Sequence, residues 1–152
     1  MAVFKDSAEF QNVFETFIKK ALAHERVGPK LAASGLVIQF VYADPSAVLT
    51  VNLKPEAPKE SGSFGAYSFA PESPWKVDVA FSQSSDLGNR FWQGQVNVIA
   101  ALAKREVKAS GSITKALALI PAIRPMYKVY SDTLRELGMN HLLVGENAVT
   151  VP

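Results

Sequence analysis

The sequence contains no cysteine, only two histidines and almost no excess of either charge. Without cysteine the chain forms no disulfide bond, binds no metal through thiolate and has no cysteine nucleophile. The 16 Lys and Arg residues against 14 Asp and Glu leave a formal charge of +2. Because so small an excess gives no general attraction to phosphate backbones, we expect no nucleic-acid partner.

Long apolar runs are also absent. The longest strongly apolar stretch without a charge covers residues 116–123, far short of the roughly 18 residues that a membrane span needs. The amino-terminal residues carry no apolar core of a signal peptide. The length of 152 residues suits one domain. The sequence thus predicts a cytoplasmic protein with a single domain over residues 1–152.

Motifs that carry catalysis are missing as well. The sequence has no Gly-x-Ser-x-Gly elbow, no phosphate-binding loop and no spacing typical of metal ligands. His24 is expected at the end of a helix, where a cation would complement the helix dipole, and His141 in a turn. An enzyme acting on a hydrophobic substrate would need one of them beside an acid in a cleft. We therefore predict no enzyme activity, no catalytic residue, no metal and no cofactor.

Aromatic residues, in contrast, are abundant: nine Phe, four Tyr and two Trp. They fall on the apolar faces of segments with helical or strand periodicity, which leaves open whether they fill a core or line a cavity. The order of segments is typical of an α+β domain built on one mostly antiparallel sheet. The predicted elements are a helix over 10–22 ended by Gly28-Pro29, strands at 36–42 and 48–53, an irregular loop at 54–74, a strand at 75–82, a short helix capped by Ser84 or Ser85, another capped by Asn97, a strand at 107–111, helical segments at 113–120 and 123–137, and a hairpin or strand within 142–151.

The segment from Trp75 to Pro121 resembles the sterol carrier protein two family of lipid-binding domains, in its bacterial-type single-domain form. A strand with a serine-rich cap is followed by Phe91-Trp92-Gln93-Gly94, by Val96-Asn97 opening a helix, and by a lysine-containing strand that ends at Gly111. The family usually has glycine where this chain has Arg105, so the turn there is expected to be built differently. It often has proline where this chain has Val98.

The resemblance implies a curved sheet of about five strands with helices over one face, enclosing an apolar tunnel. It also implies non-enzymatic binding or transfer of a fatty acyl, sterol or isoprenoid-type lipid. The candidate lining residues, each of which could equally be plain core, are Phe81, Leu87, Phe91, Trp92, Ile99, Leu102, Leu117, Ile120, Met126, Tyr127 and Tyr130.

The long carboxyl-terminal helix supports a second hypothesis. Because it brings Met126, Tyr127 and Tyr130, it could fill the cavity and leave an accessory domain. Such a domain would act by forming a homodimer or by docking to an enzyme of lipid or quinone metabolism. The basic residues between Lys104 and Lys115 favour a solvated face, with a transient membrane-surface contact as the alternative.

Overall fold

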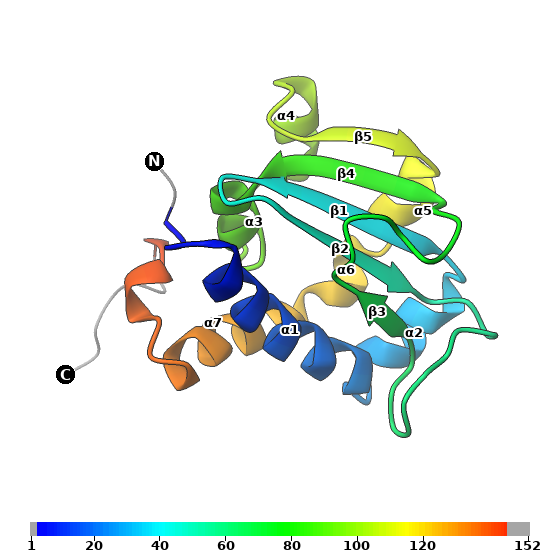
Figure 1. The fold of residues 1–152 in the computed structure, drawn as a ribbon. Helices are drawn as coiled ribbons and strands as arrows, with labels where there is room; N and C mark the ends of the chain where they lie inside the picture. Colours follow the sequence, from blue (N-terminus) through cyan, green and yellow to red (C-terminus); the bar gives the residue numbers. More distant parts are fainter. Residues whose placement is uncertain (1–2, 146–152) are drawn as a thin grey trace.

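The computed structural model describes residues 3–145 of the chain. They form one five-stranded sheet with strand order β3-β2-β1-β4-β5, and α1, α2, α6 and α7 lie on one side of it (Figure 1). Among these residues, no helix combines the length and apolar character that a membrane span requires. The elements are α1 (Ser7–Ala23), α2 (Val27–Ala33), β1 (Val37–Ala43), β2 (Ala47–Asn52), β3 (Ala66–Ser68), β4 (Val79–Ser84), α3 (Ser85–Phe91), α4 (Val98–Ala103), β5 (Lys108–Gly111), α5 (Ile113–Leu117), α6 (Ile120–Ile123), α7 (Pro125–Glu136) and the 3-10 turn η1 (Asn140–Leu142).

The sheet is mixed, and its centre is a parallel pair. β1 pairs with β2 and β2 with β3 in antiparallel fashion, and β5 pairs the same way with β4. Only β1 and β4 run parallel, with Phe40 opposite Phe81. The predicted α+β class with about five, mostly antiparallel strands is therefore confirmed.

The register of the central strands places one apolar row against the helices. Phe40 stands opposite Leu49 on β2, and Ile38 stands opposite Val51, so alternate residues from both strands share a face. On α1 the predicted aromatic row is buried, and the Phe10 and Phe14 rings stack with centroids 4.1 Å apart. Both rings also contact Tyr42 at the end of β1, which joins helix and sheet in one core.

The start of α1 is capped as predicted, but its end differs. The Asp6 carboxylate accepts a hydrogen bond from the Glu9 backbone N–H at 2.8 Å. The helix ends at Ala23, and Gly28-Pro29, expected to terminate it, lies instead in the first turn of α2. Proline is tolerated there because first-turn N–H groups have no partner within the helix. The sequence prediction missed α2.

Three further boundaries differ from prediction. The strand expected over 75–82 starts only at Val79, and the Asp78 carboxylate accepts from the backbone N–H of Val37 at 2.9 Å just before it. The irregular loop 54–74 contains the short edge strand β3. Leu142 belongs to η1 rather than to a strand, and the rest of that predicted hairpin, from residue 146 on, lies outside the described residues.

The α4–β5 connection also corrects an expectation. We expected the turn at Arg105 to avoid the left-handed conformation that glycine favours. Arg105 adopts that conformation, with φ of 61°. The backbone N–H of Glu106 closes the turn by donating to the Ala101 carbonyl at 2.9 Å, so an arginine here takes a conformation that glycine adopts more easily.

A candidate ligand-binding cavity

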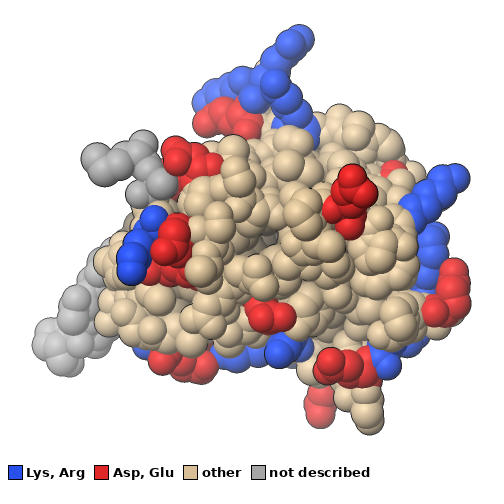
Figure 2. All heavy atoms as spheres, in the orientation of Figure 1, with Lys and Arg blue, Asp and Glu red and all other residues tan. Residues whose placement is uncertain are grey.

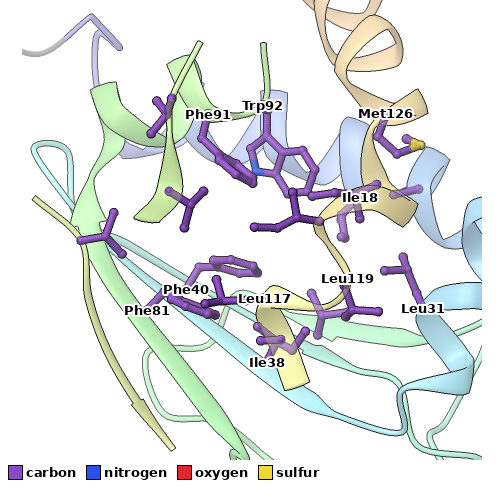
Figure 3. Close-up of a pocket in the computed structure, with 18 of the residues that line it drawn as sticks. Ile18, Leu31, Ile38, Phe40, Phe81, Phe91, Trp92, Leu117, Leu119 and Met126 are labelled. Atoms are coloured by element: carbon purple, nitrogen blue, oxygen red, sulfur yellow. The ribbon is translucent and has the colours of Figure 1, made fainter. Parts of the chain in front are cut away.

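A cavity of about 120 Å³ lies between the helices and the inner face of the sheet (Figure 3). Gln83 is the one residue with a polar side-chain amide on its wall, and no charged side chain borders it. The other lining residues are aliphatic or aromatic or, at Met126, a thioether. They are Ile18, Ala21, Val27, Leu31, Ile38, Phe40, Val51, Leu53, Phe81, Leu87, Phe91, Trp92, Val96, Val98, Val107, Ala116, Leu117, Leu119, Ile120, Ile123 and Met126.

The floor of the cavity is the parallel strand pair. Phe40 on β1 and Phe81 on β4 stack with ring centroids 6.0 Å apart and lie beneath the opening between the helices (Figure 3). The register that pairs them across the sheet also sets their side chains on the same face. Neighbouring Ile38 extends this floor.

The roof is built by α3 and the residue that follows it. The Ser84 hydroxyl accepts from the backbone N–H of Leu87 at 3.0 Å, which fixes the start of the helix as the sequence predicted. Phe91 and Trp92 meet edge-to-face at 4.9 Å, and Trp92 also contacts Phe17 of α1 at 4.8 Å. These contacts hold two aromatic rings over the floor (Figure 3).

Not all eleven candidate lining residues lie at the cavity. Ile99 is 65% exposed on α4, whereas its neighbour Val98 faces the cavity. Tyr127 is half-buried, with its ring against Gly94 and Phe91. Tyr130 is buried in the core and half-buried Leu102 packs against it, and neither borders the cavity. The candidates that do border it are Phe81, Leu87, Phe91, Trp92, Leu117, Ile120 and Met126.

Sequence reasoning missed the contribution of the first half of the chain. Ile38 and Phe40 could have been found from strand alternation, because both share a face with Tyr42. Ile18 and Ala21 belong to the apolar stripe of α1, which was predicted but not named among the lining residues. Val27 and Leu31 lie on α2, which was not predicted at all.

The carboxyl-terminal helix closes one end of the cavity without filling it. Met126 is fully buried and borders the cavity, and Tyr130 lies one turn further on, outside the lining. The remaining space is slightly smaller than an engineered apolar cavity of roughly 150 Å³ that binds one benzene. The structure thus shows a small apolar cavity, while the tunnel expected from the family stays a prediction.

Neither histidine stands at the cavity. His24 uses Nδ1 to accept from the backbone N–H groups of Arg26 and Val27, at 3.2 and 3.1 Å. His24 directly follows the last residue of α1, at a helix end as expected, and its ring joins that end to the start of α2. His141 is exposed. Within residues 3–145, no group of His, Asp and Glu side chains is arranged to hold a metal ion.

Two ionisable groups with shifted pKa values, Asp78 and Tyr67, make structural hydrogen bonds away from the cavity. Backbone hydrogen bonding from Val37 holds the pKa of Asp78 below its usual range, and Lys54, whose Nζ lies 3.2 Å from the carboxylate, adds to this effect. Burial raises the pKa of Tyr67 to about 12, assisted by its hydrogen bond to Glu15. Neither group borders the cavity, so nothing in these shifts indicates acid–base catalysis there.

Solved structures share this fold over most of the chain. Sterol carrier protein 2 from Yarrowia lipolytica, in its apo form, matches with a TM-score of 0.62 and 17% identity, covering 84% of this chain and 98% of that one. The sterol carrier protein domain 2 of Helicoverpa armigera matches with a TM-score of 0.56 and 18% identity, over 76% and 88% of the two chains. The ubiquinone synthesis protein UbiJ-SCP2 matches with a TM-score of 0.53 and 10% identity, covering 85% of this chain and 97% of that one.

A matching domain also occurs inside an enzyme. A double mutant of the sec-alkyl sulfatase PisA1 matches with a TM-score of 0.56 and 14% identity, over 71% of this chain but only 16% of the enzyme. At the sequence level, no family model and no curated protein matches the chain. The structural matches confirm the predicted resemblance as a likeness of fold: residues 3–145 have the fold of sterol carrier protein 2.

Proposed function

We propose that this protein binds and transfers a hydrophobic ligand without chemically altering it. The observation that carries the proposal is the composition of the cavity wall, where one amide stands among aliphatic, aromatic and thioether side chains. Burying each methylene of a ligand there is worth about 0.8 kcal/mol. A short apolar group therefore gains useful affinity with no reactive residue nearby, and the fold similarity to two sterol carrier protein 2 structures supports this function.

A lipid chain longer than a few carbons is larger than the cavity, so the cavity has to widen to bind it. α4 is the wall element whose movement would widen it most easily. Val98 of α4 and nearby Val96 border the cavity. Ala101 is the only buried residue of α4, so little apolar surface holds this short helix in place. We infer that α4 moves outward when a long chain enters.

The outer surface of α4 fits a brief contact with a membrane. Ile99 is the one large apolar residue that is widely exposed among residues 3–145. Lys104 and Arg105 follow the helix and are exposed, and Lys and Arg side chains project at the top of the view above α4 (Figure 2). Basic residues near an exposed apolar side chain favour an anionic bilayer surface, and the same helix covers the cavity.

The experiment is a titration with a fluorescent long-chain fatty acid, followed through Trp92 emission. A Trp75→Phe background leaves Trp92 as the only tryptophan, and Trp92 borders the cavity. Saturable binding at micromolar concentration, with displacement by an unlabelled fatty acid, is the expected result. Absence of any saturable binding by long-chain lipids would overturn the carrier function, and organic extraction of the purified protein would identify a lipid that it retains.

The second candidate function is an accessory domain that works by docking or dimerising. It is favoured by the small volume of the cavity and by the fold similarity to a ubiquinone synthesis protein. Light scattering over a range of concentrations separates the two. A monomer that binds lipid contradicts the accessory function, whereas a stable dimer that binds none supports it.

A further inference from the structure

The side-chain amide of Gln83 on β4 lies on the cavity wall and carries both a hydrogen-bond donor and an acceptor. Gln83 follows Phe81 of the cavity floor by two residues, so strand alternation turns both side chains inward. Among the described lining residues, Gln83 and Trp92 are the ones whose side chains carry an N–H group. Because a polar group in an apolar wall costs free energy unless it has a partner, the direction of each amide atom decides which ligand suits the cavity.

The amide nitrogen of Gln83 is directed toward Tyr42. The two residues stand opposite each other in the parallel register of β1 and β4. A Cβ atom added at Gly88 would lie 2.6 Å from Tyr42 Cε1 and 3.5 Å from Gln83 Nε2, so the ring and the amide nitrogen meet at α3. Burial raises the pKa of Tyr42, and hydrogen bonds from the Trp92 and Gln83 side chains oppose that rise. A group that lowers the pKa of a phenol in this way donates toward its oxygen.

The amide oxygen of Gln83 is left as the acceptor on the wall. The oxygen and nitrogen of a planar amide point in different directions from the carbon that joins them. With the nitrogen facing Tyr42, the oxygen faces away from that ring. The indole N–H of Trp92 is likewise a partner of Tyr42. The described part of the wall therefore offers an acceptor to the cavity, while its donors serve Tyr42.

Resting on the proposed function, we propose that Gln83 Oε1 accepts a hydrogen bond from the hydroxyl group of an otherwise apolar ligand, so that the cavity prefers an alcohol to a ketone or ester of the same shape. A ketone or ester would bring a second acceptor to the Gln83 oxygen and leave both unpaired. A carboxylate is disfavoured, because no charged side chain among the described lining residues compensates a buried negative charge.

The test compares cyclopentanol with cyclopentanone and methylcyclopentane, which have the same ring but no hydroxyl. Affinities are measured from shifts of the Trp92 indole N–H resonance, since Trp92 borders the cavity. In Gln83→Leu, affinity for cyclopentanol is expected to fall about five- to tenfold, and the affinities for the other two compounds are expected to stay the same. Gln39→Leu is the matched control on β1, because Gln39 does not border the cavity, and it should change no affinity.

The Gln83→Met variant, which keeps the length of the side chain and removes the amide, repeats the measurement and should give the same result. If cyclopentanone loses as much affinity as cyclopentanol, the amide nitrogen is the contact and the inference is wrong. An equal loss for all three compounds would show a packing effect, and an unchanged affinity for cyclopentanol would show that Oε1 binds no hydroxyl. Either result overturns the inference.

A separate titration distinguishes failure of this inference from failure of the proposed function. If a fluorescent fatty acid binds but cyclopentanol does not, the role of Gln83 is refuted and the carrier function stands. If neither the fatty acid nor any of the three compounds binds, the proposed function itself fails.

Discussion

The Tyr130 hydroxyl donates a hydrogen bond of 2.7 Å to Asn89 Oδ1, joining α7 to α3 inside the core. Tyr130 also packs edge-to-face on Phe17 of α1, at 5.0 Å. The long carboxyl-terminal helix α7 therefore packs against α3 and α1 rather than filling the cavity. This arrangement leaves Met126 as the part of α7 that borders the cavity.

Removing this hydrogen bond should destabilise the whole domain. We expect Tyr130→Phe to lower the free energy of unfolding by about 1–3 kcal/mol, because Asn89 Oδ1 stays buried with only the longer bond from Gln93. Urea denaturation followed by circular dichroism measures the change. Tyr127→Phe, on the same helix but half-buried, should change stability little. Equal effects of the two substitutions would contradict the role given to the Asn89 bond.

Filling part of the cavity should weaken ligand binding. Ala116→Leu adds volume at the wall, where Ala116 is 8% exposed, and should weaken binding of a fluorescent fatty acid at least about tenfold. Overpacking would cost about 1–3 kcal/mol of stability. Ala103→Leu places the same side chain on the exposed surface of α4 and should leave binding intact. Undiminished binding by a folded Ala116→Leu protein would show that lipids bind elsewhere.

Gly111 is expected to tolerate no side chain. Its φ is 89°, and a Cβ atom there would overlap the backbone carbonyl oxygen of Asp78, just before β4. Gly62 has a similar φ of 82° but open space around it. Gly111→Ala should therefore lower the melting temperature much more than Gly62→Ala, since only the first adds a steric clash to the conformational penalty. Thermal unfolding of both variants checks this, and similar losses would contradict it.

The stability of the protein should fall in acid through Asp78. Its pKa is lowered in the folded state, chiefly by the hydrogen bond from Val37. The stabilisation is thus fully present above the unfolded pKa of about 3.9 and is lost as the pH falls through the folded pKa. Denaturation at several pH values between about 6 and about 2 should show a shallower decline for Asp78→Asn. Replacing exposed Glu72 with Gln should leave the wild-type slope, and an unchanged slope for Asp78→Asn would refute this assignment.

Contact with membranes should depend on α4. Ile99→Asp is expected to reduce co-sedimentation with anionic phosphatidylglycerol vesicles, because it removes the exposed apolar side chain and adds a repulsive charge. Vesicles of phosphatidylcholine alone should bind the wild type more weakly. Fatty acid binding in the absence of vesicles should persist, since Ile99 does not border the cavity. Equal co-sedimentation of variant and wild type would rule out this surface.

The sequence predicts the elements well where a local signal defines them. The caps at Asp6, Ser84 and Asn97 all accept the expected backbone hydrogen bonds, because capping depends on residues three apart. The sequence did not predict α2. Gly and Pro usually follow the end of a helix, and no local pattern showed that Gly28-Pro29 lies in the first turn of a new one. The parallel pairing of β1 and β4 was also hidden, because it joins segments that no short-range pattern connects.

The sequence predicted an apolar cavity, but it did not predict correctly which apolar residues line it. Helical spacing identified apolar faces, yet it could not separate Met126, on the wall, from Tyr130, one turn behind it. Ile99 has the hydrophobicity of a lining residue, but adjacent Val98 takes the inward position.

The parallel pairing at the centre of the sheet has a consequence for synthesis on the ribosome. The hairpin of β1 and β2 can form as soon as it emerges, because its strands are adjacent in sequence. β4 completes the cavity floor only after the segment 53–78 has been made. Until then the edge of β1 that pairs with β4 has no partner strand, and Ile38 and Phe40 on β1 lack their neighbours on β4. The nascent chain therefore exposes an unpaired, aromatic strand edge, which is the stage at which aggregation or chaperone capture is most favourable.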